Sequence, residues 1–187
     1  MDIEKLGIEG AWIGQSPIYH DERGYLREWF KVTDIETAIG REFKVAQSNI
    51  SRSHRGVLRG IHYSLTRVGQ AKWITCVSGS IWDVVVDIRP SSPTFKKWIG
   101  VQLSAESGNA IFVAEGLGHG FVSLEDNSIV SYLLTSPYSP AEELGINPLD
   151  LELGISWPLA GPAMSPKDES APTLAMRLAE GKLPENN

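Results

Sequence analysis

Short runs of alternating apolar and polar residues fill the middle of the chain, and they constrain its fold more than any other feature. Residues 81–88 separate into one wholly apolar face and a second face that carries Asp83 and Asp87. Because successive side chains of a strand point to opposite sides, this run predicts a strand between two environments. Similar runs lie at residues 11–19, 25–31, 43–51, 56–63, 70–78, 97–104, 110–114, 119–124 and 127–135. Many short strands separated by turn signals predict a β-sandwich or barrel.

Helical signals are weak and lie outside these runs. Residues 33–40 have a cap-like start and end in a glycine, which predicts one short helix. Residues 171–181 are a second candidate, and we expect 171–187 to form a surface helix and tail. The sequence has no fixed repeat and no clear linker, so residues 1–187 are expected to form a single domain.

Composition and charge exclude several classes of protein. With 42% apolar residues the chain can build a real core. A net charge of −6 argues against broad binding to nucleic acid or to an anionic membrane. No window approaches the roughly 18 apolar residues of a membrane span, and the first residues lack the pattern of a leader. The single cysteine, Cys76, lies in an apolar run and is expected to be a buried, inert thiol. We therefore expect a cytoplasmic protein.

Two of the four histidines lie in strand patterns beside glycines, which raises a metal site as the first functional option. His62 follows Gly60, and His119 lies within EGLGHGF at 115–121. Metal-binding small barrels of the cupin type usually present two histidines one residue apart. Here Ser64 stands where the second imidazole would be, and His119 alone does not restore a three-ligand face. A metal site is therefore disfavoured but stays open as an alternative.

The basic residues near His62 suit proton transfer. A single lysine or arginine is most often solvated, but Arg59 lies in an otherwise apolar stretch, and Lys72 is expected on a neighbouring strand. A histidine can take a proton from a carbon beside a ketone, cations can stabilise the enolate, and a phenol can return a proton from the other side. This chemistry requires neither a metal nor a redox cofactor. The pattern permits it without establishing it.

Several long motifs in order carry a resemblance to the dTDP-4-dehydrorhamnose 3,5-epimerases, from about residue 5 to residue 175. They are DERG at 21–24, QSN at 47–49, GVLRGIHY at 56–63, QAKW at 70–73, DVVVDIRPSSPTF at 83–95, EGLGHGF at 115–121, SYLLTSPYSPAEE at 131–143 and SWP…SPKD ending at 168. The resemblance implies a mainly β, cupin-like jelly roll, that is a double-stranded β-helix barrel with a few short peripheral helices. It also implies a homodimer in which N-terminal strands join the partner's sheet.

The resemblance assigns roles to individual residues. His62 would be the catalytic base, Asp168 its carboxylate partner and Tyr132 the proton donor on the opposite face. Lys72 is expected beside the substrate ketone. The remaining matches imply substrate binding, with Arg59 and His119 at the sugar and phosphates, Tyr138 against the thymine, and Arg23, Glu28, Gln47, Ser48, Asn49, Glu143 and Lys167 along the nucleotide-sugar site. No metal ligand is implied, and Asp83 is left open between a cavity residue and a structural one.

Three positions depart from the family pattern. Ser48 stands where the family often has an acidic residue, Ser64 where it commonly has Gln, and Leu133 where many relatives carry Lys. These departures favour the branch that serves antibiotic and other secondary deoxysugars, in which some enzymes invert only one carbon. Single and double epimerisation therefore both remain open.

We therefore expect a cofactor-independent isomerase. Its expected reaction is epimerisation of dTDP-4-dehydro-6-deoxy-D-glucose at carbon 3, carbon 5 or both, to dTDP-4-dehydro-L-rhamnose or a related 4-keto-deoxysugar. Two alternatives stay open, namely a metal-dependent cupin oxygenase or isomerase and a sugar-nucleotide binding module without turnover.

Overall fold

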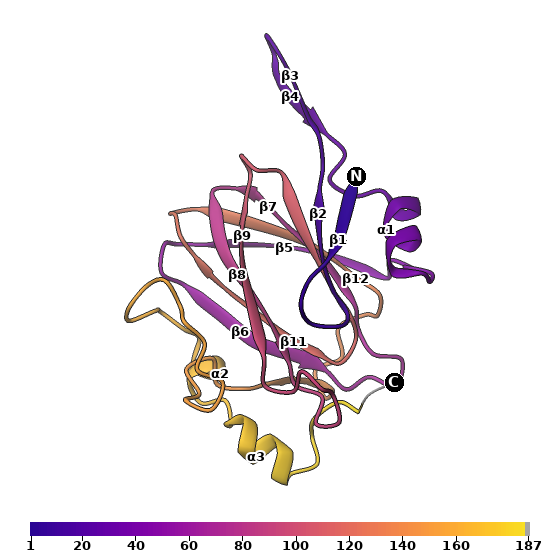
Figure 1. Ribbon diagram of the computed structural model, residues 1–187. Coiled ribbons are helices and arrows are strands. Elements are labelled where there is room, and N and C mark those ends of the chain that lie inside the picture. The colour runs from indigo at the N-terminus through magenta and orange to yellow at the C-terminus, as the bar shows by residue number, and fades with distance from the viewer. Residues whose placement is uncertain (186–187) are drawn as a thin grey trace.

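Two antiparallel sheets form the body of the protein in a computed structural model that describes residues 1–185 (Figure 1). The six-stranded sheet has the order β1 (Asp2–Lys5), β2 (Ala11–Gln15), β10 (Asn109–Val113), β7 (Lys72–Ser78), β12 (Ser128–Leu134) and β5 (Gln47–Ser53). The five-stranded sheet has the order β13 (Glu143–Gly145), β6 (Leu58–Ser64), β11 (Leu117–Ser123), β8 (Ser80–Asp87) and β9 (Trp98–Ser104). From β5 to β8 and from β10 to β13 the chain alternates between the sheets, which confirms the predicted cupin-like jelly roll.

A separate hairpin of β3 (Ile18–Asp21) and β4 (Gly24–Arg27) projects away from this body (Figure 1). The sequence pattern predicted one strand over 11–19 and another over 25–31. The first is instead divided between β2 and β3, and the second ends at Arg27. Pro17 stands at the break, where its missing N–H cannot continue a ladder. The hairpin thus carries its residues beyond the barrel.

The described part of the chain has three short helices, which lie at the periphery. Helix α1 (Val32–Ile39) matches the helix predicted for 33–40, and Gly40 closes it in the left-handed region at φ 72°. Helix α2 (Pro166–Glu169) was not expected, and the Ser165 side chain caps it by accepting from the Asp168 N–H. Helix α3 spans Leu174–Ala179. Within residues 1–185, no helix has the length and apolar character needed to cross a membrane.

Apolar side chains are buried on both faces of the central strands. Between the sheets lie residues such as Ile74, Val85 and Ile111. The other face of β8 carries Val84 and Val86, which pack against the C-terminal part of the chain through Ile146, Leu153 and Leu174. Strand β8 is therefore covered on both sides. Besides the terminal Ser80, its polar side chains are Asp83 and Asp87, and both are buried. Each must therefore find hydrogen-bond partners inside the fold.

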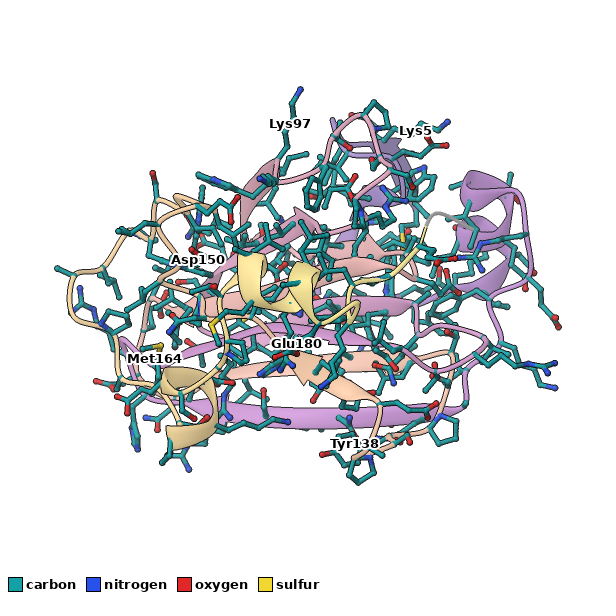
Figure 2. All side chains as sticks on the ribbon, turned by 90° about the horizontal axis from the view of Figure 1, so that it is seen from below. Lys5, Lys97, Tyr138, Asp150, Met164 and Glu180 are labelled. Carbon is teal, nitrogen blue, oxygen red and sulfur yellow. The ribbon has the colours of Figure 1, made fainter. Side chains whose placement is uncertain are left out.

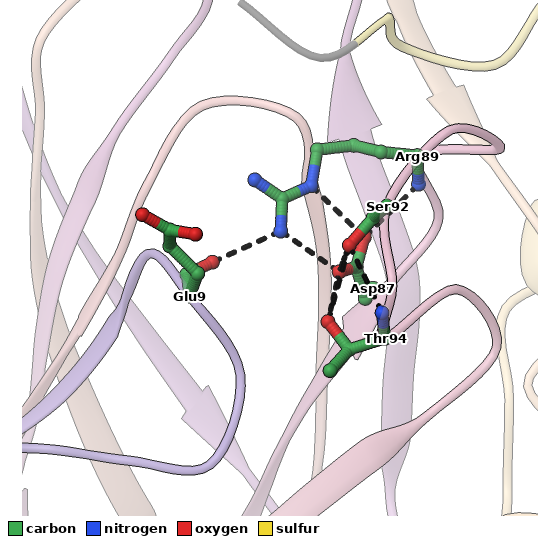
Figure 3. A network of polar contacts seen from close by, with 5 residues as sticks. All are labelled: Glu9, Asp87, Arg89, Ser92 and Thr94. Carbon is green, nitrogen blue, oxygen red and sulfur yellow. Dashed lines mark hydrogen bonds and ion pairs between the residues drawn. The ribbon is translucent and has the colours of Figure 1, made fainter.

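Asp87 organises the loop between β8 and β9 (Figure 3). Its carboxylate accepts hydrogen bonds from Arg89 Nε at 2.9 Å, Ser92 Oγ at 2.5 Å and Thr94 Oγ1 at 2.6 Å. Arg89 Nη2 also donates to the Glu9 carbonyl at 3.0 Å, which ties this loop to the β1–β2 turn. Burial alone would raise the pKa of Asp87, but these donors outweigh it and the pKa is lowered. The carboxylate thus stabilises the loop as an anion.

A pair of glycines brings β6 and β11 close together. Gly60 has φ 131°, and a Cβ at this position would lie 2.5 Å from the Cα of Gly120. The register of the two strands places His62 opposite His119, with an irregularity between His119 and Phe121. The glycines of the two sequence motifs therefore allow the strand contact that sets the two imidazoles side by side.

Candidate active site

Two adjoining cavities lie between the sheets and share His62, Lys72 and Tyr132. The rim cavity has a volume of about 180 Å³, and the deep cavity about 160 Å³. The other residues of the rim cavity are Asn49, Gln70, Leu134, Tyr138, Glu143, Leu144 and Lys167. The other residues of the deep cavity are Ser51, Arg59, Ile74, His119, Phe121 and Val130. Because three residues line both cavities, we treat the two as one cleft.

A larger hollow of about 570 Å³ lies elsewhere and is lined by charged residues, among them Arg41, Arg89 and Glu115. Its arginines already have carboxylate partners, since Arg41 pairs with Glu115 and Arg89 pairs with Asp87. The smaller cleft, in contrast, gathers an imidazole, an ammonium and a phenol. Chemistry rather than volume therefore identifies the candidate active site.

His62 and Asp168 form a hydrogen-bonded pair at the cleft. His62 Nε2 lies 2.7 Å from Asp168 Oδ1, and the exposed side-chain fractions are 38% and 7%. Burial alone would raise the pKa of Asp168, but the hydrogen bond and charge of His62, together with hydrogen bonds from Ser165 and Gly60, outweigh it, and the pKa is lowered. An ionised Asp168 favours the tautomer that carries its proton on Nε2, so Nδ1 of His62 is left as a proton acceptor.

Tyr132 stands on the wall opposite His62. His62 belongs to β6 of the five-stranded sheet, whereas Tyr132 belongs to β12 of the six-stranded sheet. Both side chains line the rim cavity and the deep cavity. In the strand register Tyr132 faces Asn49 on one side and Ile74 on the other. The cleft therefore presents an imidazole from one sheet and a phenol from the other.

Lys72 is the buried cation of the cleft, and only 8% of its surface is exposed. Burial lowers the pKa of the Lys72 ammonium, while the negative charges of Glu143 and Asp83 act in the opposite direction. Lys72 begins β7, next to Leu134 of β12. A substrate oxygen that enters the cleft would thus meet a positive charge in surroundings that screen it weakly.

His119 and Arg59 line the deep cavity. His119 Nε2 lies 2.8 Å from Oδ2 of Asp83, and Asp83 is fully buried. Asp83 Oδ1 has no hydrogen-bond partner among residues 1–185. Arg59 Nε donates to Ser53 Oγ at 3.0 Å. Asp83 thus contacts a cavity residue without lining either cavity itself.

Both histidines of the cleft have a carboxylate partner. Nε2 of His62 and Nε2 of His119 are each hydrogen-bonded to a carboxylate. In the described part of the chain no three His, Cys, Asp or Glu side chains are grouped as metal ligands.

Tyr138 and two amides continue the cleft at its rim. Gln47 Nε2 donates to Asn49 Oδ1 at 3.0 Å, and Gln47 Oε1 accepts from the Tyr138 N–H at 2.8 Å. The Tyr138 side chain is 55% exposed and lies at the edge of the molecule, where Figure 2 labels it. The exposed Lys167 of α2 lines the same cavity. The rim can therefore offer an aromatic surface, amides and a cation.

Three of the residues predicted for the site are not brought to the cleft by their own chain. Arg23 sits at the turn of the β3–β4 hairpin, where its side chain is 89% exposed and pairs with Asp21. Glu28 follows the hairpin and is exposed. Ser48 is exposed and, by the alternation of β5, points away from the face that carries Gln47 and Asn49.

Gln70 is the main polar residue of the cleft to which the sequence analysis gave no role. It is 7% exposed and donates to Glu143 Oε1 at 3.0 Å. The signal that could have identified it is its place in the QAKW motif. It stands two residues before Lys72, and in an extended chain side chains two residues apart point to the same face. The other unassigned lining residues are mostly apolar, and an apolar residue in a strand pattern does not distinguish a cavity wall from a core.

Comparisons with known proteins agree on one family. The family model described as dTDP-4-dehydrorhamnose 3,5-epimerase matches residues 5–176. The chain is 43% identical over 187 residues to the dTDP-4-dehydrorhamnose 3,5-epimerase of Mycobacterium tuberculosis, covering 98% of this chain and 93% of the relative.

Two solved structures are similar over nearly the whole chain. NovW, a 4-keto-6-deoxy sugar epimerase from the novobiocin biosynthetic gene cluster of Streptomyces spheroides, has a TM-score of 0.96 at 44% identity, covering 99% of this chain and 93% of that one. ChmJ, a 3'-monoepimerase from Streptomyces bikiniensis in complex with dTDP-quinovose, has a TM-score of 0.93 at 48% identity, covering 96% and 91%.

Proposed function

The chain belongs to the dTDP-4-dehydrorhamnose 3,5-epimerase family, and from that premise we propose how its cleft acts on a dTDP-linked 4-keto-6-deoxyhexose. The enzyme is an isomerase, and the proposed reaction inverts carbon 3, carbon 5 or both of dTDP-4-dehydro-6-deoxy-D-glucose. One observation carries the mechanism: an imidazole and a phenol from opposite sheets line the same cleft. A proton can then leave one face of the sugar and another can arrive on the opposite face, which is inversion.

His62 is the proposed base. A hydrogen on a carbon next to a ketone is acidic enough for an imidazole to remove it when the resulting enolate is stabilised. Asp168 holds the imidazole in one tautomer through the 2.7 Å hydrogen bond and stabilises the imidazolium that forms. The lowered pKa of Asp168 keeps this carboxylate ionised at neutral pH.

Lys72 is the proposed stabiliser of the enolate oxygen. Its ammonium is buried in the cleft, and the negative charges of Glu143 and Asp83 act on it. A fixed charge in a poorly screened site favours the transition state, in which the ketone oxygen becomes negative, over the neutral ketone. Neither a metal nor a redox cofactor is needed for this step.

Tyr132 is the proposed proton donor. It lines both cavities from β12, across the cleft from His62. If its phenol protonates the enolate at carbon 5 on the face away from His62, the configuration at that carbon inverts. Which carbons are inverted then depends on how the enolate turns or leaves in the cleft.

The rest of the cleft is proposed to hold the nucleotide. Tyr138 offers an exposed ring at the rim for stacking on the thymine. Arg59 and His119 lie in the deep cavity and are proposed to contact the sugar and the diphosphate. The proposed polar contacts along the rim come from Gln47, Asn49, Glu143 and Lys167.

We propose that the protein is a homodimer whose contact is formed by the hairpin and the edge of the six-stranded sheet. Tyr25 and Leu26 of the hairpin are 52% and 65% exposed, and Ile50 of the edge strand β5 is 74% exposed. Exposed apolar side chains on a projecting hairpin and on an open sheet edge favour pairing with a second copy. Such pairing would also give Arg23 and Glu28, which lie outside their own cleft, a route to the partner's cleft.

Sedimentation of variants tests the dimer. Leu26→Glu and Ile50→Glu should each convert the protein to monomers in analytical ultracentrifugation, whereas Val68→Glu, at another exposed apolar position, should leave the dimer intact. A wild-type protein that sediments as a monomer at micromolar concentration would contradict the proposal.

We also propose a cytoplasmic location, which the single and buried cysteine supports.

Incubation with dTDP-4-keto-6-deoxyglucose in deuterated water tests the activity. An epimerase should place deuterium at carbon 3, carbon 5 or both, and His62→Asn should incorporate almost none. A binding module without turnover would bind the nucleotide and give no label. A metal-dependent enzyme would contain stoichiometric metal that is lost in His62→Asn and His119→Asn, which metal analysis of the three purified proteins would reveal.

A further inference from the structure

Gln70 occupies a buried position between the loop after β12 and the charged groups of the rim cavity. Its Nε2 donates to Glu143 Oε1 at 3.0 Å and also lies 3.3 Å from the Ser136 carbonyl and 3.4 Å from Ser136 Oγ. All of these contacts come from one amide nitrogen in a side chain that is 7% exposed. A single group thus joins the segment before β7 to Ser136 and to the start of β13.

Glu143 matters here because it is one of the two negative charges that act on Lys72, the other being Asp83. Gln70, Lys72 and Glu143 line the same rim cavity. Asp83 is held by its contact with His119 through Oδ2. Glu143 is the other carboxylate, and it lies on the rim side of the cleft. A carboxylate on a three-residue strand needs an external contact to hold its direction, and the Gln70 amide supplies one.

We propose that Gln70 is a positioning residue, which holds the Glu143 carboxylate in place as the counter-charge of Lys72 and so keeps an ammonium beside the substrate ketone. The inference rests on the proposed function and deepens it, since it adds a residue that acts on the enolate stabiliser through Glu143. A purely structural role for Gln70 would affect stability but not the titration of Lys72.

Other titratable groups also face Lys72, and the test must separate them. They are His62, Arg59, His119, Tyr132, Tyr138 and Lys167 along the cavities, and Asp83 behind His119. A double-mutant cycle between Gln70 and Glu143 isolates their pairwise coupling, because the other groups are the same in all four proteins.

The variants are Gln70→Met, Glu143→Gln and the double variant, with Gln102→Met as the matched control. Gln102 is an exposed glutamine on the edge strand β9. Gln70→Met should lower kcat about tenfold, a size typical of coupled residues in contact. The alkaline limb of its kcat profile should move to lower pH, because a less neutralised Lys72 loses its proton more readily. In the Glu143→Gln background the same change should alter kcat less than about twofold.

Additive effects, or an unchanged kcat and pH profile in Gln70→Met, would overturn the proposal. If Gln70→Met does not fold, Gln70→Asn replaces it, since the shorter amide cannot span the same distance to Glu143. Titration of the Lys72 Cε resonance in ¹³C-lysine-labelled protein without substrate provides a readout that does not depend on turnover. The Lys72 pKa should fall in Gln70→Met and stay unchanged in Gln102→Met.

This titration also separates the two ideas. Absence of epimerase activity in the wild-type protein would count against the proposed function, whereas the Lys72 titration would still report whether Gln70 acts through Glu143. An unchanged Lys72 pKa in Gln70→Met would overturn the inference even in an active enzyme.

Discussion

His62 and Asp168 are 106 residues apart in the chain, yet their side chains meet at 2.7 Å. His62 is fixed on β6, whereas Asp168 belongs to a helix of four residues that the Ser165 side chain caps. The C-terminal segment therefore does more than cover the outer face of the five-stranded sheet. It also delivers the carboxylate that contacts the imidazole of the proposed base.

Asp168→Asn should lower kcat by about 10²- to 10⁴-fold, because an amide can neither fix the Nε2–H tautomer nor stabilise the imidazolium. The affinity for dTDP should stay within about twofold by calorimetry if the change acts only on proton transfer. A variant that retains the wild-type kcat would show that the pair has no catalytic role.

Local patterns in the sequence were sufficient for most of the barrel. The run around Asp83 and Asp87 predicted β8 because its apolar and mixed faces alternate with the period of a strand. Strand β1 was missed because DIEK has a single apolar residue, Ile3, among three charged ones, so no alternation is visible. Pairing with β2 defines this strand in the structure. Strand β13 has only three residues, too few for a period to show.

The site was less accessible to pattern alone. Alternation could place His62 on a strand, but nothing local relates it to Asp168, and only the family resemblance suggested that pair. Gln70 was missed because its role depends on Ser136 and Glu143, which the fold brings to it from over 60 residues away. Arg23 illustrates the opposite case, since its motif is plain in the sequence while its own chain leaves it on a projecting hairpin.

Tyr132→Phe should impair the final protonation more than the initial proton loss. Because only the hydroxyl is removed, His62 can still take the substrate proton, and loss of a general acid costs about 10²- to 10⁴-fold in the step that it serves. The rate at which deuterium is lost from labelled substrate should therefore exceed the rate of inverted product formation.

Tyr63→Phe provides the control for that comparison. The Tyr63 hydroxyl donates to the Lys182 carbonyl at 2.7 Å and is buried outside the two cavities. Its loss should reduce stability by about 1 kcal/mol and leave the ratio of the two rates unchanged. Inverted product formed by Tyr132→Phe at the parental rate would show that another group donates the proton.

Asp87→Asn should reduce the free energy of unfolding at pH 7 by about 3 kcal/mol, the cost of breaking a buried charge pair. The pKa of Asp87 is lowered in the folded protein, so its contribution is present above the unfolded pKa and is lost as pH falls through the folded pKa. The difference from wild type in urea unfolding should therefore shrink below about pH 4.

The matched change Glu152→Gln removes the carboxylate that pairs with Lys96 in an exposed ion pair. It should cost less than about 1 kcal/mol at pH 7. Equal costs for the two variants would mean that the Asp87 network does not stabilise the loop between β8 and β9.

Gly60 meets two requirements, a positive φ and space for the close approach of β11, and a comparison of Gly60→Ala with Gly56→Ala separates them. A Cβ at residue 60 would lie 2.5 Å from the Cα of Gly120, and this backbone atom cannot move without shifting β11. Gly56 also has a positive φ, 82°, but no atom lies within 4 Å of its Cβ position. Gly56→Ala should therefore show the conformational cost alone, about 1–2 kcal/mol, while Gly60→Ala should cost at least about twice as much.

Because the shift of β11 would also move His119 relative to His62, Gly60→Ala should lose activity beyond its loss of stability, measured as kcat at a temperature where the variant is fully folded. Equal unfolding free energies for the two variants would show that β6 and β11 have room to separate.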